Sequence, residues 1–431
     1  MSRKISLKDI FYTIFALLLI LIGIVSFKNA NIIFVASLTL LVSVINFIRY
    51  RSSPFHFIVF GFILFSNYSI CFAQYIKPIN SIYASLFNTE YSRISICVLL
   101  IFNSLLLLFN CLPHKECSNV ENKFLNKEFF NPIIVIGALL LLIVIFTFGF
   151  DRATTEGARG DISSYYEYSI ILFLVGFFFC GDKKGYKIAL LSVLAMYVLQ
   201  DLVYGGRITS LQLLLLSYLI FFFDKKINVL KVLPLGVCGL AVFSAVGQLR
   251  GRFNFSLESI VDAFEMLADG SFALDTAYAA FYASQIFVVA ALVDPVATKL
   301  NMFGSFLLSI ITGGSAESNL SLYTRNFSWH GGGGLAPFYM FYYLGYVGVI
   351  LIGIYIAAIL RKLGRNNSYF GKAVTIYVVA TVPRWYLYSL LAITRGLLIL
   401  GVVFGICYLA DCLMKKKKLQ FNKSKSINVG G

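Results

Sequence analysis

The sequence contains many apolar runs of about twenty residues, and each run ends at a short polar or charged break. A run of this length is what an α-helix needs to cross the hydrocarbon core of a bilayer. With 59% hydrophobic and 13% charged residues among 431, the chain has more apolar side chains than a water-soluble core could bury. The sequence therefore predicts an all-α polytopic membrane protein with about twelve transmembrane helices. We expect these helices at 10–27, 30–48, 55–73, 94–112, 132–150, 166–180, 188–204, 208–223, 232–248, 335–360, 373–392 and 396–414.

The breaks after every second helix hold most of the lysines, and this pattern predicts the orientation. The net charge is +16, which in a membrane protein reflects basic cytoplasmic loops rather than nucleic-acid binding. We expect a multi-pass membrane protein, in contact with membrane lipids, with both termini in the cytoplasm. Its expected parts are an N-terminal transmembrane bundle (1–248), a long outer loop (249–334), C-terminal transmembrane helices (335–414) and a basic cytoplasmic tail (415–431).

The type of basic residue differs between the two sides of the predicted topology. The inner side is mainly lysine, whereas the outer side holds Arg93, Arg152, Arg159, Arg207, Arg250, Arg252, Arg325, Arg384 and Arg395. Orientation needs only positive charge, but a guanidinium also presents a planar fork that matches phosphate. The outer arginines therefore indicate an anion site, with pairing to outer acids or contact with lipid headgroups as the simpler alternative.

The predicted outer segment 249–334 is far longer than any other connection, and long ordered connections are usually functional. Residues 256–270 show an amphipathic helical pattern, with apolar residues at helical spacing and acids on the opposite face. The runs 274–293 and 303–312 are apolar, and the parity of the spans requires that both enter the membrane as a re-entrant pair or that neither crosses. The segment ends in Trp329, His330 and a run of four glycines.

We expect the outer residues to form a site for a pyrophosphate-linked sugar, with no metal and no cofactor, because no metal or nucleotide motif occurs. Aromatic side chains at Trp329, Tyr204 and Tyr323 are candidates to stack on sugar rings, although outer aromatics also form the interfacial belt. Candidate general bases are His330, Asp201 and Glu317, with the acids of 151–167 behind them. The candidate pyrophosphate ligands are Arg152, Arg159, Arg207, Arg250, Arg252, Arg325 and Arg384.

These features together resemble a known family. The helix number, the late outer loop, Gly206-Arg207 opening a helix, Arg250-Gly-Arg252, and His330 followed by glycines and Gly345-x-x-Gly348 look like the Wzy-type O-antigen polymerases. The resemblance implies a glycosyltransferase-C-like fold in the bacterial inner membrane, with the long outer loop 249–334 in the periplasm. It also implies a reaction that moves a growing glycan from one undecaprenyl-pyrophosphate carrier onto the repeat unit of another, donor and acceptor both being carrier-linked. A chain-length-regulating co-polymerase is the protein partner that it suggests.

Three other functions remain open from the sequence. An O-antigen ligase would use the same apparatus with a different acceptor. A lipid-linked oligosaccharide flippase would have a similar length and helix number, with cations along a central cavity and short loops. A secondary transporter would show broken helices with polar residues at mid-membrane, for which Arg384 after Pro383 is the best candidate.

Overall fold

The computed structural model describes residues 7–27, 29, 31–51, 53–77, 89–111, 129–151, 161–203, 207–222, 275–314, 318–365 and 368–428. Within these ranges the regular structure is helical, apart from the short antiparallel pair β1 (Phe150–Asp151) and β2 (Asp161–Ile162). The helices of the first half are α1 (Leu7–Val25), α2 (Ile32–Tyr50), α3 (Pro54–Asn67), the π-helix η1 (Tyr68–Ile76), α4 (Thr89–Cys111), α5 (Pro132–Phe148), α6 (Ser164–Phe179), α7 (Lys184–Val203) and α8 (Ile208–Phe222). Those of the second half are α11 (Asp275–Val293), α12 (Val296–Thr312), α13 (Leu320–Tyr323), the 3-10 helix η4 (Thr324–Asn326), α14 (Ala336–Lys362), α15 (Tyr369–Ala380), α16 (Val382–Leu387) and α17 (Leu391–Asn428).

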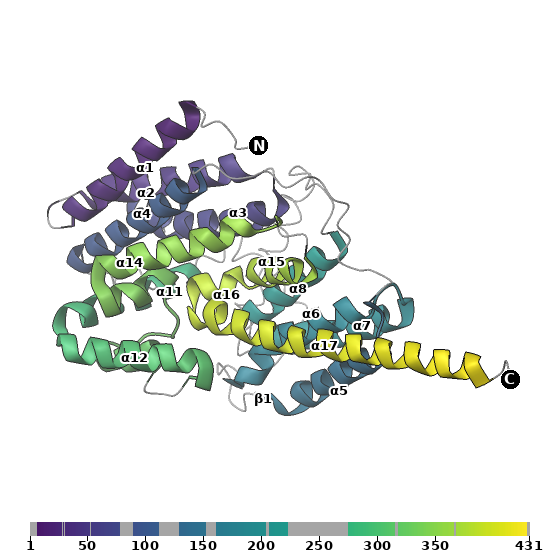
Figure 1. The fold of residues 1–431 in the computed structure, drawn as a ribbon. Coiled ribbons are helices and arrows are strands. Elements are labelled where there is room, and N and C mark those ends of the chain that lie inside the picture. Colours follow the sequence, from purple (N-terminus) through teal and green to yellow (C-terminus); the bar gives the residue numbers. More distant parts are fainter. Residues whose placement is uncertain are drawn as a thin grey trace, which may run out of the picture.

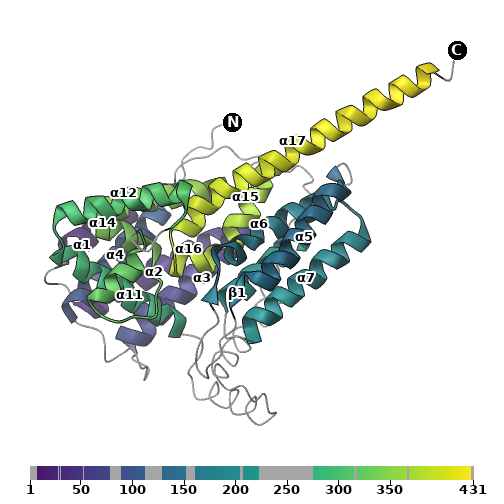
Figure 2. The ribbon, with the colours of Figure 1, turned by 90° about the horizontal axis from the view of Figure 1, so that it is seen from below.

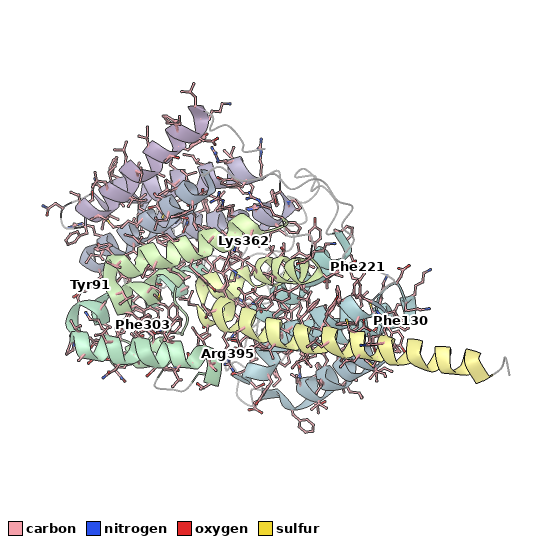
Figure 3. The ribbon with its side chains drawn as sticks, in the orientation of Figure 1. Tyr91, Phe130, Phe221, Phe303, Lys362 and Arg395 are labelled. Atoms are coloured by element: carbon pink, nitrogen blue, oxygen red, sulfur yellow. The ribbon has the colours of Figure 1, made fainter. Side chains whose placement is uncertain are left out.

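Eight helical segments of the described chain are long and apolar enough to cross a membrane, and further apolar helices are shorter. The outer faces of the bundle carry mainly carbon side chains (Figure 3), for example Leu140, Leu141 and Val144 of α5, all more than half exposed. Such a surface suits lipid rather than water. The fold therefore supports the expected multi-pass helical membrane protein.

Two groups of helices flank a central set (Figures 1 and 2). One group contains α1, α2, α4, α11, α12 and α14, the other contains α5, α6 and α7, and α15 and α16 lie between them. In the first group α4 is the central helix, packed by α1, α2 and α14. A β-carbon at Gly23 would lie 2.6 Å from the Ile101 side chain, and one at Gly353 would lie 2.6 Å from that of Leu105. Small residues therefore let α1 and α14 approach α4 closely.

The expected helix 373–392 is interrupted, which corrects the sequence prediction. It forms α15 and the short α16, and α17 begins only at Leu391. Pro383 has no N–H to continue the hydrogen bonding of α15, but a proline is accepted in the first turn of a helix, where it stands in α16. The break places Arg384 in the first turn of a separate short helix.

The expected helix 335–360 is also interrupted, although it keeps its overall extent. Gly345 has φ 61° and ψ −144°, a conformation that essentially only glycine adopts. A β-carbon at Gly348 would lie 2.0 Å from the carbonyl oxygen of Met340, so the chain folds closely upon itself after the break. The Gly345-x-x-Gly348 motif is therefore required by the backbone of α14.

The second half of the predicted outer segment is helical and packs within the bundle. α11 is itself long and apolar enough to span, and it contacts α4 and α14. α12 follows after Asp294-Pro295 and contacts α14 and α17. This packing favours the alternative in which both helices enter together. The expected helices at 232–248 and 256–270 lie outside the described residues.

The C-terminal tail differs from expectation as well. α17 continues to Asn428 and runs past the other helices (Figure 2), where the sequence predicts that the last helix ends at 414 and a basic tail follows. Lysine is a good helix former, and Lys415 pairs with Asp411 one turn earlier at 2.7 Å. The helix therefore extends beyond the apolar part of its sequence.

Candidate functional site

The ends of several helices surround a cavity of about 660 Å³, called here the arginine cavity. Its walls come from the start of α6, from α12, from Gly314 and residues 318–333, from the first part of α14, and from α16 and the start of α17. All of these belong to segments that the sequence places on, or next to, the outer side. The fold thus brings the predicted outer segments to one site.

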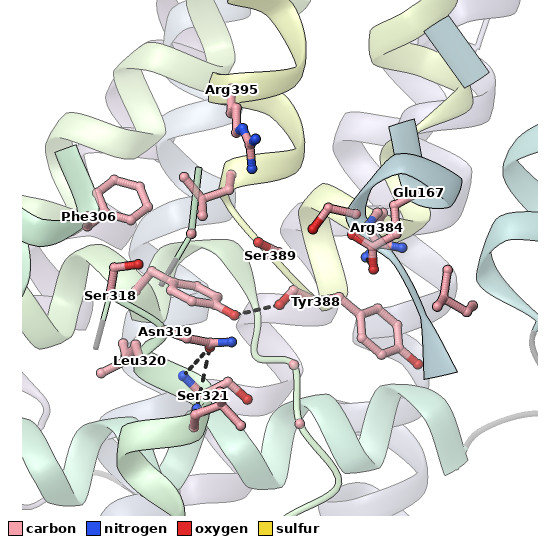
Figure 4. Close-up of a pocket in the computed structure, with 18 of the residues that line it drawn as sticks. Glu167, Phe306, Ser318, Asn319, Leu320, Ser321, Arg384, Tyr388, Ser389 and Arg395 are labelled. Carbon is pink, nitrogen blue, oxygen red and sulfur yellow. Dashed lines mark hydrogen bonds and ion pairs between the residues drawn. The ribbon is translucent and has the colours of Figure 1, made fainter. Parts of the chain in front are cut away.

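Three arginines line this cavity, namely Arg325 of η4, Arg384 of α16 and Arg395 of α17. Figure 4 shows Arg384 beside Glu167 of α6, with which it forms an ion pair, and Arg395 pointing inward from α17. The guanidinium of Arg395 also lies over the Tyr168 ring, 5.2 Å from its centroid. Glu167 is the only carboxylate of the cavity wall within the described residues. The described residues of the wall therefore carry an excess of two positive charges.

Arg384 is held in place because the rest of α16 is anchored in the bundle. The Trp385 indole N–H donates to the carbonyl of Val378 at 3.0 Å, and the Tyr386 hydroxyl donates to Oδ1 of Asn67 at 3.0 Å. Both aromatic side chains are fully buried. With two neighbouring side chains fixed in the core, Arg384 is left facing the cavity.

Arg325 is positioned by a short capped helix. Oδ1 of Asn319 accepts hydrogen bonds from the backbone N–H groups of Ser321 and Leu322, as Figure 4 shows, and so starts α13. η4 follows directly and carries Arg325, with its guanidinium close to Gly332. The cap therefore fixes the direction from which Arg325 enters the cavity.

The glycine run forms part of the cavity wall with its backbone. Gly332, Gly333 and Gly334 have φ of 89°, 84° and 149°, where residues with side chains are strained. A β-carbon at Gly334 would lie 2.4 Å from the Phe287 ring. The backbone N–H of Gly334 donates to the Leu387 carbonyl at 3.0 Å. Glycine is therefore needed here for close docking against α11 and α16, rather than as a flexible linker.

His330 lies beside the cavity but not in its wall. Its Nδ1 accepts from the N–H of Gly332 at 3.3 Å, and its Nε2 lies 3.0 Å from the Thr324 hydroxyl. Because the Thr324 hydroxyl donates to the Leu320 carbonyl, Nε2 carries the proton and donates to it. Burial, assisted by the positive charge of Arg325, lowers the pKa of His330 to about 4. Its expected role as a base stays a prediction, and in this structure the ring braces the glycine run.

Asp201 and Arg207 lie around the start of α8. Oδ2 of Asp201 accepts from both the N–H and the hydroxyl of Ser210, at 2.9 and 2.8 Å, and so caps this helix. Asp201 is fully buried and does not line the cavity. Arg207 directly precedes Ile208, which does line it. Asp201 is thus placed to stabilise a helix beside the site.

The expected sugar-stacking residues are dispersed. The Tyr323 hydroxyl donates to the carboxylate of Asp294 at 3.0 Å, which also accepts from Tyr342 at 2.7 Å. Trp329 is 76% exposed on the surface. Neither Tyr323 nor Trp329 lines the arginine cavity. The remaining expected site residues lie outside the described part of the chain: Tyr204, Arg152, Arg159, Arg250, Arg252 and Glu317.

The structure adds cavity residues that the sequence did not single out as ligands. Arg395 belongs to the outer arginines and Glu167 to the outer acids, so their residue types gave a signal. Tyr168, Tyr339 and Tyr388 also line the cavity, and nothing in the sequence pointed to them except the large number of aromatic residues. The Tyr339 hydroxyl donates to the backbone carbonyl of Tyr388, which ties α14 to the α16–α17 connection (Figure 4).

Comparison of the chain with protein-family models, curated proteins and solved structures finds no match. The chemistry of the site is therefore argued from its own residues. Three guanidiniums with one carboxylate favour an anion with two or more charges, and hydroxyl-bearing aromatic walls suit a sugar attached to it.

Proposed function

We propose that this protein is a metal-independent glycosyltransferase of the bacterial inner membrane that joins oligosaccharide repeat units carried on undecaprenyl pyrophosphate. In this proposal the product is an O-antigen or a related surface polysaccharide, and the reaction takes place at the outer face of the membrane. The observation that carries it is the convergence of Arg325, Arg384 and Arg395 with Glu167 in one cavity.

The arginines act on the leaving group in this reaction. As the bond between the anomeric carbon and the diphosphate oxygen breaks, the bonding electrons pass to the diphosphate. Guanidiniums already aimed at that position stabilise the developing charge without reorganisation. Arg384 and Arg395 reach it from α16 and α17, and Arg325 from η4.

Glu167 acts on the acceptor. A hydroxyl of the acceptor glycan forms the new bond to the anomeric carbon and gives its proton to the Glu167 carboxylate. Glu167 fits this role because it is the carboxylate of the described cavity wall and because its partner Arg384 also contacts the leaving group in the proposed arrangement. Proton acceptor and leaving-group ligand are then held together by one ion pair.

The test is genetic and uses the surface polysaccharide of the host. The gene is deleted and complemented with wild type, Arg384→Ala, Arg395→Ala, or the control Arg51→Ala. Arg51 is an exposed arginine at the end of α2, away from the cavity. We expect the deletion to leave lipid A-core capped with single repeat units, the cavity variants to lose the polymer ladder, and the control to keep it.

Other outcomes would identify another function. Loss of all capping while polymer accumulates on its carrier would indicate a ligase. Loss of both polymer and single-unit capping would indicate a flippase. A full ladder from Arg384→Ala and Arg395→Ala at normal protein levels would overturn the role of the arginine cavity.

A further inference from the structure

A second, more apolar groove of about 480 Å³ adjoins the arginine cavity. Its walls are formed by the end of α5, the start of α6, the last residue of α12 with the two glycines after it, and α17. The apolar side chains inside it include Ile145, Leu172, Ile399 and Val403. It is called here the apolar groove.

The groove and the cavity share part of their walls. Ser164, Tyr168, Gly314 and Arg395 line both of them. Arg395 is therefore the charged group at the junction, with the other two arginines on one side and, among the described residues, only apolar and hydroxyl-bearing side chains and glycines along the groove on the other. A molecule that occupies both spaces must be anionic at one end and apolar at the other.

The surface beside the groove is apolar. Apolar side chains next to its wall residues are exposed on three of the four wall elements, as at Phe148 of α5 (80%), Ile311 of α12 (73%) and Val402 of α17 (53%). Exposed apolar surface of this kind faces hydrocarbon in a membrane protein. A lipid tail could thus pass from the bilayer into the groove without entering water.

We propose that the apolar groove holds the first isoprene units of a long-chain isoprenyl diphosphate whose diphosphate lies in the arginine cavity. This inference rests on the proposed function and adds the path by which the carrier reaches the site, laterally between α6 and α17. A volume of this size accommodates a drug-sized group, so the remainder of the tail stays in the bilayer.

The groove makes room for the tail but contributes little to the free energy of binding. Lipid tails are as apolar as the groove walls, so moving a tail from bilayer to groove gains little hydrophobic free energy. Affinity comes from the diphosphate and the guanidiniums. Filling the groove should therefore weaken only ligands that carry a tail, because the diphosphate could then not reach the arginines.

A binding experiment on the purified full-length protein in lipid nanodiscs tests this. Undecaprenyl diphosphate and inorganic pyrophosphate are the two probes. Ile399→Trp and Leu172→Trp fill the groove, and Leu409→Trp, at an exposed position further along α17 that lines neither space, is the matched control. We expect the groove variants to bind undecaprenyl diphosphate at least tenfold more weakly than wild type, to bind pyrophosphate within about twofold of it, and the control to match wild type for both.

Each contrary result has a distinct meaning. Unchanged binding of undecaprenyl diphosphate by both groove variants would overturn the groove as the tail site. Equal losses for both probes would overturn it too, because the substitution would then act on the cavity. Wild type that binds pyrophosphate but not undecaprenyl diphosphate would overturn the proposed function along with the inference.

Discussion

At the scale of single residues, Glu167 accepts the proton of the acceptor in the proposed reaction, and its partner Arg384 binds the leaving diphosphate. In Glu167→Gln the size of the side chain is kept and its charge is lost. We expect transfer to fall by about 10²- to 10⁴-fold, as when a general base is removed. Binding of pyrophosphate should hold or tighten, because Arg384 loses its competing carboxylate. Turnover of lipid-linked repeat units and pyrophosphate binding are measured on the same preparation. Unchanged turnover would mean that Glu167 only balances the charge of Arg384 and is not the base.

His330 gives a prediction about stability at acid pH. The unfolded chain protonates this histidine near pH 6.5, whereas the folded protein does so only near 4. Between these values the unfolded state binds more protons, so the free energy of unfolding falls as the pH is lowered, by on the order of 3 kcal/mol. His330→Gln keeps an amide N–H for Thr324 and should lose this dependence. Thermal unfolding of both proteins between pH 7 and 4 measures it, and parallel curves would contradict the buried neutral histidine.

At the scale of elements, the break in α14 separates two functions of one predicted helix. Residues before Gly345 include Tyr339 and Tyr343 of the cavity wall, and residues after it pack on α4. A β-carbon at Gly345 meets no atom within 4 Å, so Gly345→Ala adds only backbone strain, about 1–3 kcal/mol. Gly405→Ala in α17 is the control, since it is equally open but helical and should be neutral or stabilising. Equal unfolding midpoints for the two variants would argue against the strained turn.

The elements also show what the sequence could and could not predict. Helices α1, α2, α5, α6 and α8 lie within a few residues of the predicted runs, because bilayer thickness fixes the length of an apolar helix. The predicted helices 335–360 and 373–392 run through the breaks at Gly345 and Pro383, although Pro383-Arg384 is the sequence's best candidate for a broken helix. Arg325 and Arg384 were found by residue type. The burial of His330 and the inward position of Tyr388 depend on segments that meet only after folding, and one chain's residue types do not encode that.

At the scale of the whole molecule, all walls of the arginine cavity belong to segments predicted to be at the outer face or next to it, while the lysine-rich turns are predicted inside. Trp329 is predicted outside and Lys184 inside, and both side chains are exposed, so they can report the two sides of the membrane. We expect a membrane-impermeant maleimide to label Trp329→Cys in intact spheroplasts, and Lys184→Cys only after the membrane is permeabilised. Of the described native cysteines, Cys71, Cys97 and Cys180 are buried, but Cys407 is half-buried and Cys412 is exposed, so the wild-type protein is labelled in parallel and its signal is subtracted.

The reverse labelling pattern would have a definite consequence. It would turn the arginine cavity toward the cytoplasm, where an arginine-rich site has access to soluble phosphates and where the positive-inside rule already accounts for basic residues. Labelling of both positions in intact spheroplasts would mean that the segment between them crosses the membrane an even number of times. With the predicted pattern the cavity arginines lie on the outer side, where the orientation rule does not account for them. An anionic ligand would account for them, and the proposed lipid-linked diphosphate is such a ligand.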